Sequence, residues 1–358
     1  KGIKSGPIDI KKTTLRGIVQ DKALALDFRS TNDTTTVMRI SSNITRSKDT
    51  LRIHLDPGNL VLNKNKWTIA QDNRITLAPK VMKFDDFLLA RNNQKLTISS
   101  DKQGMEEEHI AIGFENFSLA SILTFLNPEE TLASGRLQGE FIVENPFTKP
   151  GMLADLDINQ FKVMEVDMGT LSLNAKSLNG ADYDFDMGVS GGEVDLDLTG
   201  KYQSSETAAQ LDLKLELNEI KTSALAGFSM GELEEGTGNL SGNINITGTT
   251  IDPQYEGTIN FNDAGFKVAK LNAPFVLNNE VLKLDNNGIY FNDFTVRDKK
   301  QNSFVVDGSI GTENMLDPTF DLNLSANDFQ VLDSSKEDFD LVYGTAVFDA
   351  EATITGNL

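Results

Sequence analysis

The sequence predicts an all-β protein: an elongated, repetitive sheet with a few short helices. Three observations support this fold class. Apolar and polar residues alternate along most of the 358 residues, turn-forming residues separate the alternating segments, and short motifs recur at intervals of about 105 residues.

Alternation is clearest in residues 211–217, where leucine occupies every second position and Asp, Lys and Glu occupy the others. Successive side chains of a strand point to opposite faces, so such a segment has one apolar and one polar face. Clusters such as residues 286–288, Asn-Asn-Gly, separate these segments at the spacing of short antiparallel strands. We therefore expect a long meander.

Helical spacing of apolar residues occurs in two places. Residues 119–126 place Leu and Ile at this spacing, with Ser118 as an N-cap before them and Pro128 just after. A second candidate helix runs from residue 222 to about residue 235. The first run is far shorter than the ~20 apolar residues that span a bilayer.

The composition excludes several classes of protein. Lys and Arg number 33 against 53 Asp and Glu, and the net charge of −20 predicts repulsion of nucleic acid and of anionic lipid headgroups. Cysteine is absent, which excludes disulfides, Cys-ligated zinc and a thiol nucleophile. The chain starts without Met and stops within a recurring motif, so we interpret it as a segment of a longer protein.

An internal repeat organises the chain. The motif Gly-x-Leu-x-Gly at residues 135–139 recurs at residues 238–242, and Gly344 opens a further copy. We expect one continuous β-repeat segment over residues 1–358, with approximate modules 1–134, 135–237, 238–343 and 344–358. Each module buries its apolar face against its neighbours.

The apolar face of so long a sheet needs a cover that two short helices do not supply. Either the sheet closes into a filled solenoid, or it curls into an open trough whose lining meets an apolar ligand. The alternation by itself leaves both possibilities open.

The sequence offers little catalytic chemistry. Its two histidines, His54 and His109, lie far apart, and neither a Gly-x-Ser-x-Gly elbow nor a nucleotide-binding glycine loop is present. Residues 182–186 imitate the start of an EF-hand loop, but Met187 stands where the loop requires Gly, which favours a solvated acidic strand. We expect no enzymatic activity, metal or cofactor.

A longer pattern points to a family. It comprises Gly238-x-Leu240-x-Gly242-x-Ile244-x-Ile246-x-Gly248, then Asp252-Pro253-x-Tyr255-x-Gly257, then Phe266-x-Val268, and later Phe329-x-Val331 before Tyr343-Gly344. This succession resembles the carboxy-terminal region of the TamB family, most closely from about residue 116 to residue 358.

The resemblance implies an AsmA-like, periplasmic protein, anchored in the inner membrane by a part outside this chain, that reaches an outer-membrane barrel partner of the TamA or BamA type. Family members fold as a U-shaped β-taco, whose apolar groove conducts phospholipid acyl chains in support of outer-membrane biogenesis. The strands with the cleanest alternation then supply the candidate lining of the groove: Leu156, Ile158, Val194, Leu196, Leu198, Leu211, Leu213, Leu215, Leu217, Ile244, Ile246, Ile259, Phe261, Leu282, Leu284, Leu322 and Leu324.

Two other functions compete with the lipid conduit. The first is a structural scaffold or assembly partner of an outer-membrane barrel, with a filled core and no ligand. The second is a surface adhesin or glycan-binding solenoid, which ranks last because such proteins use exposed aromatic platforms and this chain has one Trp and five Tyr.

Overall fold

The computed structural model describes residues 3–5, 8–10, 12–126, 132–177, 180–205, 207–313, 317–337 and 343–357. The chain divides into two compact units. Unit 1 contains Lys1–Val163 and Leu171–Tyr183, and unit 2 contains Met164–Thr170 and Asp184–Leu358. Pro128, which was expected to follow the first helix, lies outside the described residues.

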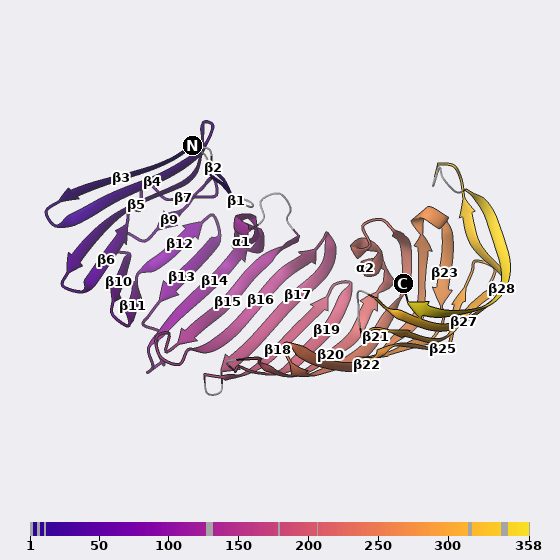
Figure 1. Cartoon of the computed structure of the whole chain (residues 1–358). Helices are drawn as coiled ribbons and strands as arrows, with labels where there is room; N and C mark the ends of the chain where they lie inside the picture. The colour runs from indigo at the N-terminus through magenta and orange to yellow at the C-terminus, as the bar shows by residue number, and fades with distance from the viewer. Residues whose placement is uncertain are drawn as a thin grey trace. The chain divides into compact units, whose positions relative to one another are not determined.

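Strands dominate both units (Figure 1). The described residues form 28 strands, two α-helices and one short 3-10 helix, and strands β9 and β12 to β28 belong to one antiparallel sheet. This arrangement confirms the predicted all-β class with few helices.

Unit 1 begins with a two-stranded sheet, β1-β2, and continues with a sheet of strand order β11-β10-β6-β5-β4-β3, to which β7 and β8 attach through β5. The next strands pair successively, from β9 with β12 through to β15 with β16. The strands of unit 1 are β1 Ile3–Ser5, β2 Ile8–Ile10, β3 Lys12–Gln20, β4 Ala23–Asn32, β5 Thr35–Ser47, β6 Thr50–Leu55, β7 Val61–Leu62, β8 Asn65–Lys66, β9 Thr68–Ile69, β10 Arg74–Ala78, β11 Val81–Asp85, β12 Phe87–Arg91, β13 Gln94–Ser99, β14 His109–Ser118, β15 Ala133–Glu144 and β16 Gly151–Val163.

Two strands, β17 Val166–Ser177 and β18 Asp182–Gly191, contribute residues to both units. The strands of unit 2 are β19 Val194–Gln203, β20 Gln210–Lys221, β21 Leu233–Thr249, β22 Asp252–Val268, β23 Ala273–Leu277, β24 Glu280–Asp285, β25 Gly288–Arg297, β26 Ser303–Gly311, β27 Thr319–Ser334 and β28 Gly344–Asn357. Strand β22 pairs with β23 along one half and with β24 along the other, so these two form one interrupted return strand.

The first predicted helix is confirmed as α1, Leu119–Leu126. The second prediction is wrong in length, because α2 ends at Phe228 and Leu233 already belongs to β21. Met230 and Gly231 have positive φ values of 54° and 89°, and this left-handed turn ends the helix. The acidic residues 182–186 form part of β18, as the strand interpretation predicted.

Each unit has its own core. In unit 1, the buried residues Leu60, Trp67, Ile69, Phe117 and Leu137 form one cluster, against which Ile122 of α1 packs. The Trp67 and Phe117 rings stack with their centroids 5.6 Å apart. In unit 2, buried clusters surround Leu240, Ala264, Leu277 and Phe294, and surround Ala273, Phe275 and Phe329.

A recurring β-bulge keeps these aromatic residues on one face. Opposite Asp307, strand β25 places two residues, Asn292 and Asp293, and Asp293 adopts a φ of 49°. Residues three positions apart in a regular strand face opposite sides. Because the bulge places two residues opposite one, Phe291 and Phe294 point to the same side, with ring centroids 5.6 Å apart. The Asp307 carboxylate accepts a hydrogen bond from the freed N–H of Asp293 at 3.3 Å.

The same device occurs elsewhere with an acidic or amide residue at the left-handed position. In β14, Asn116 has a φ of 49° and separates Phe114 from Phe117. In β27, Asp328 has a φ of 48°, and its N–H donates to the Asp349 carboxylate at 2.7 Å. Asn and Asp tolerate this backbone conformation better than other non-glycine residues, which explains the residue type.

Gly238 allows β21 and β22 to approach each other at such an irregularity. Its φ is 69°, and a Cβ atom placed there would lie 2.1 Å from the carbonyl oxygen of Asp263. We expect Gly238→Ala to lower the free energy of unfolding by more than about 3 kcal/mol, since a backbone collision adds to the left-handed strain. Urea denaturation measures the change.

The matched control is Gly231→Ala. Gly231 has a φ of 89°, with no atom within 4 Å of a Cβ placed there. This substitution adds strain without a collision and is expected to cost about 1 kcal/mol. Equal losses for the two variants would contradict the close-approach explanation.

Asp298 joins the β25–β26 turn to β27. Its side chain is 1% exposed and accepts hydrogen bonds from the N–H groups of Lys300, Asn302 and Gln330 at 2.8, 2.9 and 2.9 Å. Burial raises the pKa of this carboxyl, but the three N–H donors outweigh burial and hold its pKa below the ordinary value.

We expect Asp298→Asn to destabilise the chain by about 2 kcal/mol or more at pH 7, because the amide cannot accept all of these bonds. A lowered pKa contributes stability that is full above the unfolded value, about 3.9, and is lost as pH falls through the folded value. The wild-type advantage should therefore shrink between pH 5 and pH 2 in urea titrations. Asp186→Asn, on an exposed residue, is the control and should change stability little.

Candidate functional site

One face of the unit 2 sheet is apolar across strands β19 to β22 and β24. Leu213 pairs with Ile246 across β20 and β21, and Leu215 pairs with Ile244. Leu284 of β24 then pairs with Gly257 of β22, the residue opposite Ile244. Paired residues of antiparallel strands project to the same side, so these side chains form one continuous surface.

The register places all the candidate lining residues of unit 2 on this surface, which we call the unit 2 apolar face. They are Val194, Leu196, Leu198, Leu211, Leu213, Leu215, Leu217, Ile244, Ile246, Ile259, Phe261, Leu282 and Leu284, together with Leu322 and Leu324 of β27, to which the surface continues through β25 and β26. Leu156 and Ile158 belong to unit 1, where they pair with Gly139 and Leu137.

Burial divides the candidates. Val194 and Leu322 are buried, at 4% and 8% exposed, whereas the other thirteen in unit 2 are only partly buried. Ile259, Phe261 and Leu282 pack against a core cluster of unit 2. In unit 1, Leu156 and Ile158 pack against the cluster around Trp67, so they support a core there.

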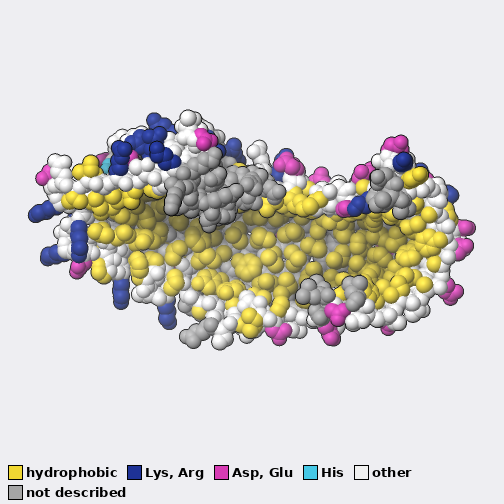
Figure 2. Space-filling model, turned by 45° about the horizontal axis from the view of Figure 1, so that its top comes forward, with side chains coloured by type: hydrophobic (Ala, Val, Ile, Leu, Met, Phe, Trp, Pro, Cys, Tyr) yellow, Lys and Arg dark blue, Asp and Glu magenta, His cyan; other side chains and the backbone are white. Residues whose placement is uncertain are grey.

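The opposite face of the same strands is polar. Lys214 and Glu216 form an ion pair at 2.5 Å, and the Asn218 amide donates to Asp195 and Asp197 at 2.9 and 2.8 Å. Figure 2 shows the apolar face of unit 2 as a hollow covered by hydrophobic side chains, with Asp and Glu around its rim. The sheet therefore separates an apolar interior side from a solvated, acidic exterior side.

Alternation alone did not identify the aromatic residues that adjoin this face. Phe275 stacks on Phe329 with centroids 5.6 Å apart, and Phe304 and Phe348 pack around them. Some of these aromatic residues belong to a four-residue pattern that is visible in the sequence. The pattern is an apolar residue, two polar residues of which the second is Asp or Asn, and a second apolar residue. This pattern marks a bulge, as at residues 291–294 and 326–329.

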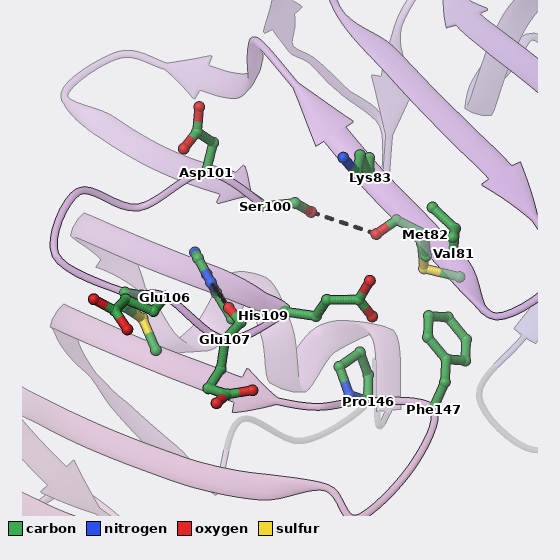
Figure 3. A pocket seen from close by; sticks show the side chains of 12 residues that line it. Val81, Met82, Lys83, Ser100, Asp101, Glu106, Glu107, His109, Pro146 and Phe147 are labelled. Atoms are coloured by element: carbon green, nitrogen blue, oxygen red, sulfur yellow. Dashed lines mark hydrogen bonds between the residues drawn. The ribbon is translucent and has the colours of Figure 1, made fainter.

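A separate cavity of about 240 Å³ lies in unit 1, near the loop before β14 (Figure 3). Its lining mixes acidic side chains of residues 101–108 with Met82 and Phe147, and Ser100 Oγ donates to the Met82 carbonyl at 3.5 Å. His109 is 6% exposed; its Nε2 accepts from the Lys102 N–H and its Nδ1 contacts the Glu107 carbonyl at 2.8 Å. Both ring nitrogens are engaged, so His109 holds the loop in place.

His54 is likewise engaged, through Nδ1 and the Asn73 carbonyl at 2.8 Å. Within the described ranges, no three His, Asp or Glu side chains are placed to hold a metal ion. Among the helices of those ranges, none has the length and apolarity needed to cross a bilayer.

Family models match nearly the whole chain. The model described as TamB, N-terminal domain, matches residues 3–261, and the model described as TamB C-terminal domain matches residues 292–358. The chain belongs to the TamB family. This confirms the resemblance, and it extends the match to the first residues and assigns residues 3–261 to the N-terminal domain of the family. No curated protein matches the chain, and no solved structure does.

The TamB family consists of transport and assembly components that are anchored in the inner membrane and span the periplasm. Membership gives this TamB-family chain a role in the translocation and assembly module of the outer membrane, with a TamA-type outer-membrane protein as the partner that the family implies.

Stability measurements can distinguish an open apolar face from a filled core. Leu213 is partly exposed, and Leu240 is 8% exposed within a core cluster. We expect Leu213→Ala to cost about 1 kcal/mol, because little buried area is lost. Leu240→Ala should cost about 2–5 kcal/mol because it leaves a cavity. Comparable losses in urea denaturation would show that Leu213 lies in a filled core.

Proposed function

We propose that this TamB-family chain carries phospholipid through an apolar groove, as part of a periplasmic bridge that supports outer-membrane biogenesis. The observation that carries the proposal is the unit 2 apolar face. Its aliphatic side chains share one side of the sheet in register and are left partly exposed. A soluble domain rarely leaves so large an apolar surface uncovered unless it binds something there.

The physical chemistry suits acyl chains. Each CH₂ group transferred from water to an apolar surface gains about 0.8 kcal/mol. The hydrophobic effect is non-directional, so this gain is the same at every position along an apolar lining. A tail can therefore move along a continuous apolar lining without exposure to water, while the headgroup remains in solvent at the rim. Such movement is diffusive and requires no catalytic residue.

The location and partners follow from the family. In this proposal the chain is a periplasmic part of an inner-membrane-anchored protein, and its partner is an outer-membrane barrel of the TamA or BamA type. The modules predicted at 135–237 and 238–343 then act as successive lengths of the same groove; their limits stay a prediction.

A structural scaffold is the second candidate, because parts of both units are filled. Trp67 and Phe117 stack in the unit 1 core, and Phe275 and Phe329 stack in unit 2. If the remaining apolar face were also filled in the complete protein, its role would lie in docking the barrel partner.

Photo-crosslinking in cells tests the conduit. A photoreactive residue is placed at Leu213, Ile246 or Leu284, which share the apolar face. The matched controls are the neighbouring positions Lys214, Asn245 and Lys283, which the register places on the opposite face. We expect lipid adducts, identified by mass spectrometry, at the apolar positions only.

Equal labelling of the two sets, or no lipid adduct at any position, would contradict the conduit. Protein adducts at the apolar positions, in place of lipid, would support the scaffold.

A further inference from the structure

Charge is distributed unevenly along the chain. Residues 1–99 contain 18 Lys and Arg, nine Asp and no Glu, a net charge of +9, whereas residues 100–358 contain 15 Lys and Arg and 44 Asp and Glu, a net charge of −29. The overall charge of −20 is therefore the sum of a basic segment and a strongly acidic one. The repulsion from anionic headgroups that was predicted from the net charge does not apply to residues 1–99.

The basic residues gather on one face of the second sheet of unit 1. Across β3, β4 and β5, Thr14 pairs with Arg29 and Arg29 pairs with Arg39; farther along, Arg52 pairs with Thr76. The register assigns to this face, which we call the basic face, Lys12, Arg16, Arg29, Arg39, Arg52, Arg74 and Lys83, with the acids Asp27 and Asp85. Its opposite side carries Leu26, Phe28, Ile40, Ile44 and Ile53.

Most of this charge is available to a partner. All seven basic residues except Arg39 are exposed. Asp27 is already engaged, since its carboxylate accepts from Ser41 Oγ at 2.6 Å and from Arg39 Nε at 3.2 Å. Figure 2 shows Lys and Arg side chains gathered around the N-terminal strands.

The same region exposes large aliphatic side chains. Leu15, Ile18 and Val19 of β3 are 65%, 67% and 76% exposed, and β3 is the edge strand of the sheet. Ile18 lies on the basic face, two positions from Arg16, whereas Leu15 and Val19 project to the opposite side at the same strand edge, where they pair with Phe28 and Leu24. Exposed aliphatic residues next to several basic ones are typical of surfaces that bind a membrane interface, where the apolar groups insert and the charges meet headgroups.

We propose that the basic face, with its β3 edge, binds an anionic phospholipid surface. Charge complementarity selects a polyanion. The exposed Ile18 of this face, with Leu15 and Val19 on the other side of the same edge strand, favours a lipid surface over nucleic acid, since His54 is the single aromatic ring that the described strands present on the basic face for stacking on bases. This inference goes beyond the proposed function, because it concerns headgroup binding outside the unit 2 apolar face.

Vesicle flotation with the 358-residue chain tests the proposal, using phosphatidylcholine vesicles with and without one quarter phosphatidylglycerol. The variant Lys12→Glu, Arg16→Glu, Arg29→Glu reverses three charges on the basic face. The control Lys201→Glu, Lys283→Glu, Lys299→Glu makes the same change in net charge in unit 2, at three exposed lysines. Circular dichroism and urea denaturation verify that each variant is folded.

We expect the chain to float with the anionic vesicles and not with the neutral ones, and about 0.5 M NaCl to weaken binding. Each basic residue near an anionic surface contributes about a factor of five, so the basic-face variant should bind at least about 100-fold more weakly. The control should bind as the wild type does.

Several outcomes would overturn the proposal. Equal binding of neutral vesicles would mean adsorption through an apolar surface, a result compatible with the groove. Equal losses in the two triple variants would mean that only net charge matters. Tighter binding of a DNA oligonucleotide than of anionic vesicles would assign the basic face to nucleic acid.

A fluorescent label gives a second, local readout. Because the chain has no cysteine, Ile18→Cys accepts a single environment-sensitive dye. Ile251→Cys is the matched control, an isoleucine that is 78% exposed in unit 2. Anionic vesicles should shift the emission to the blue at residue 18 only. A shift at both positions, or at residue 251 alone, would contradict docking through β3.

Discussion

The structure depends on the two-residue period of its strands. Side chains alternate between faces, and antiparallel pairing joins like positions of neighbouring strands, so one register error would move a whole strand of leucines to the wrong side. The pairings of Leu213 with Ile246 and of Leu284 with Gly257 keep the aliphatic residues of β20 to β24 together. Everything proposed for the apolar face follows from this register.

Bulges protect the register where the sheet is irregular. An extra residue in one strand would invert every later side chain if it were accommodated within the regular alternation. At Asn116, Asp293 and Asp328 the chain instead adopts a left-handed conformation, and the extra residue is absorbed. At Asn116 and Asp293, phenylalanines on both sides of the bulge then face the same way, and at Asp328 the two residues are Ala326 and Phe329. These residues join the core clusters of their units.

The polar faces of the two units carry opposite charge. The polar side of the unit 2 sheet is acidic, with Asp195, Asp197 and Glu216 on neighbouring strands. The second sheet of unit 1 carries arginines at the corresponding polar positions, including Arg29 paired with Arg39. One backbone pattern thus supports an apolar side in unit 2 and polar sides of opposite charge in the two units.

Much of this protein could be predicted from the sequence, because its folding pattern is local. Alternation in residues 211–217 specifies a strand and its two faces, and the spacing of residues 119–126 specifies a helix, whatever the rest of the chain does. The family also followed from short motifs in a fixed order. The early end of α2 was missed because the left-handed turn at Met230 and Gly231 carries a weaker signal than the apolar spacing through Leu233.

Only the tertiary structure decided which leucines remain exposed. Leu240 and Leu213 occupy similar alternating patterns, yet Leu240 is 8% exposed within a core cluster and Leu213 stays partly exposed on the unit 2 face. Burial depends on what lies across from a side chain, and that neighbour comes from distant parts of the chain. The basic face likewise required the register, because its arginines lie on separate strands and meet only when those strands pair.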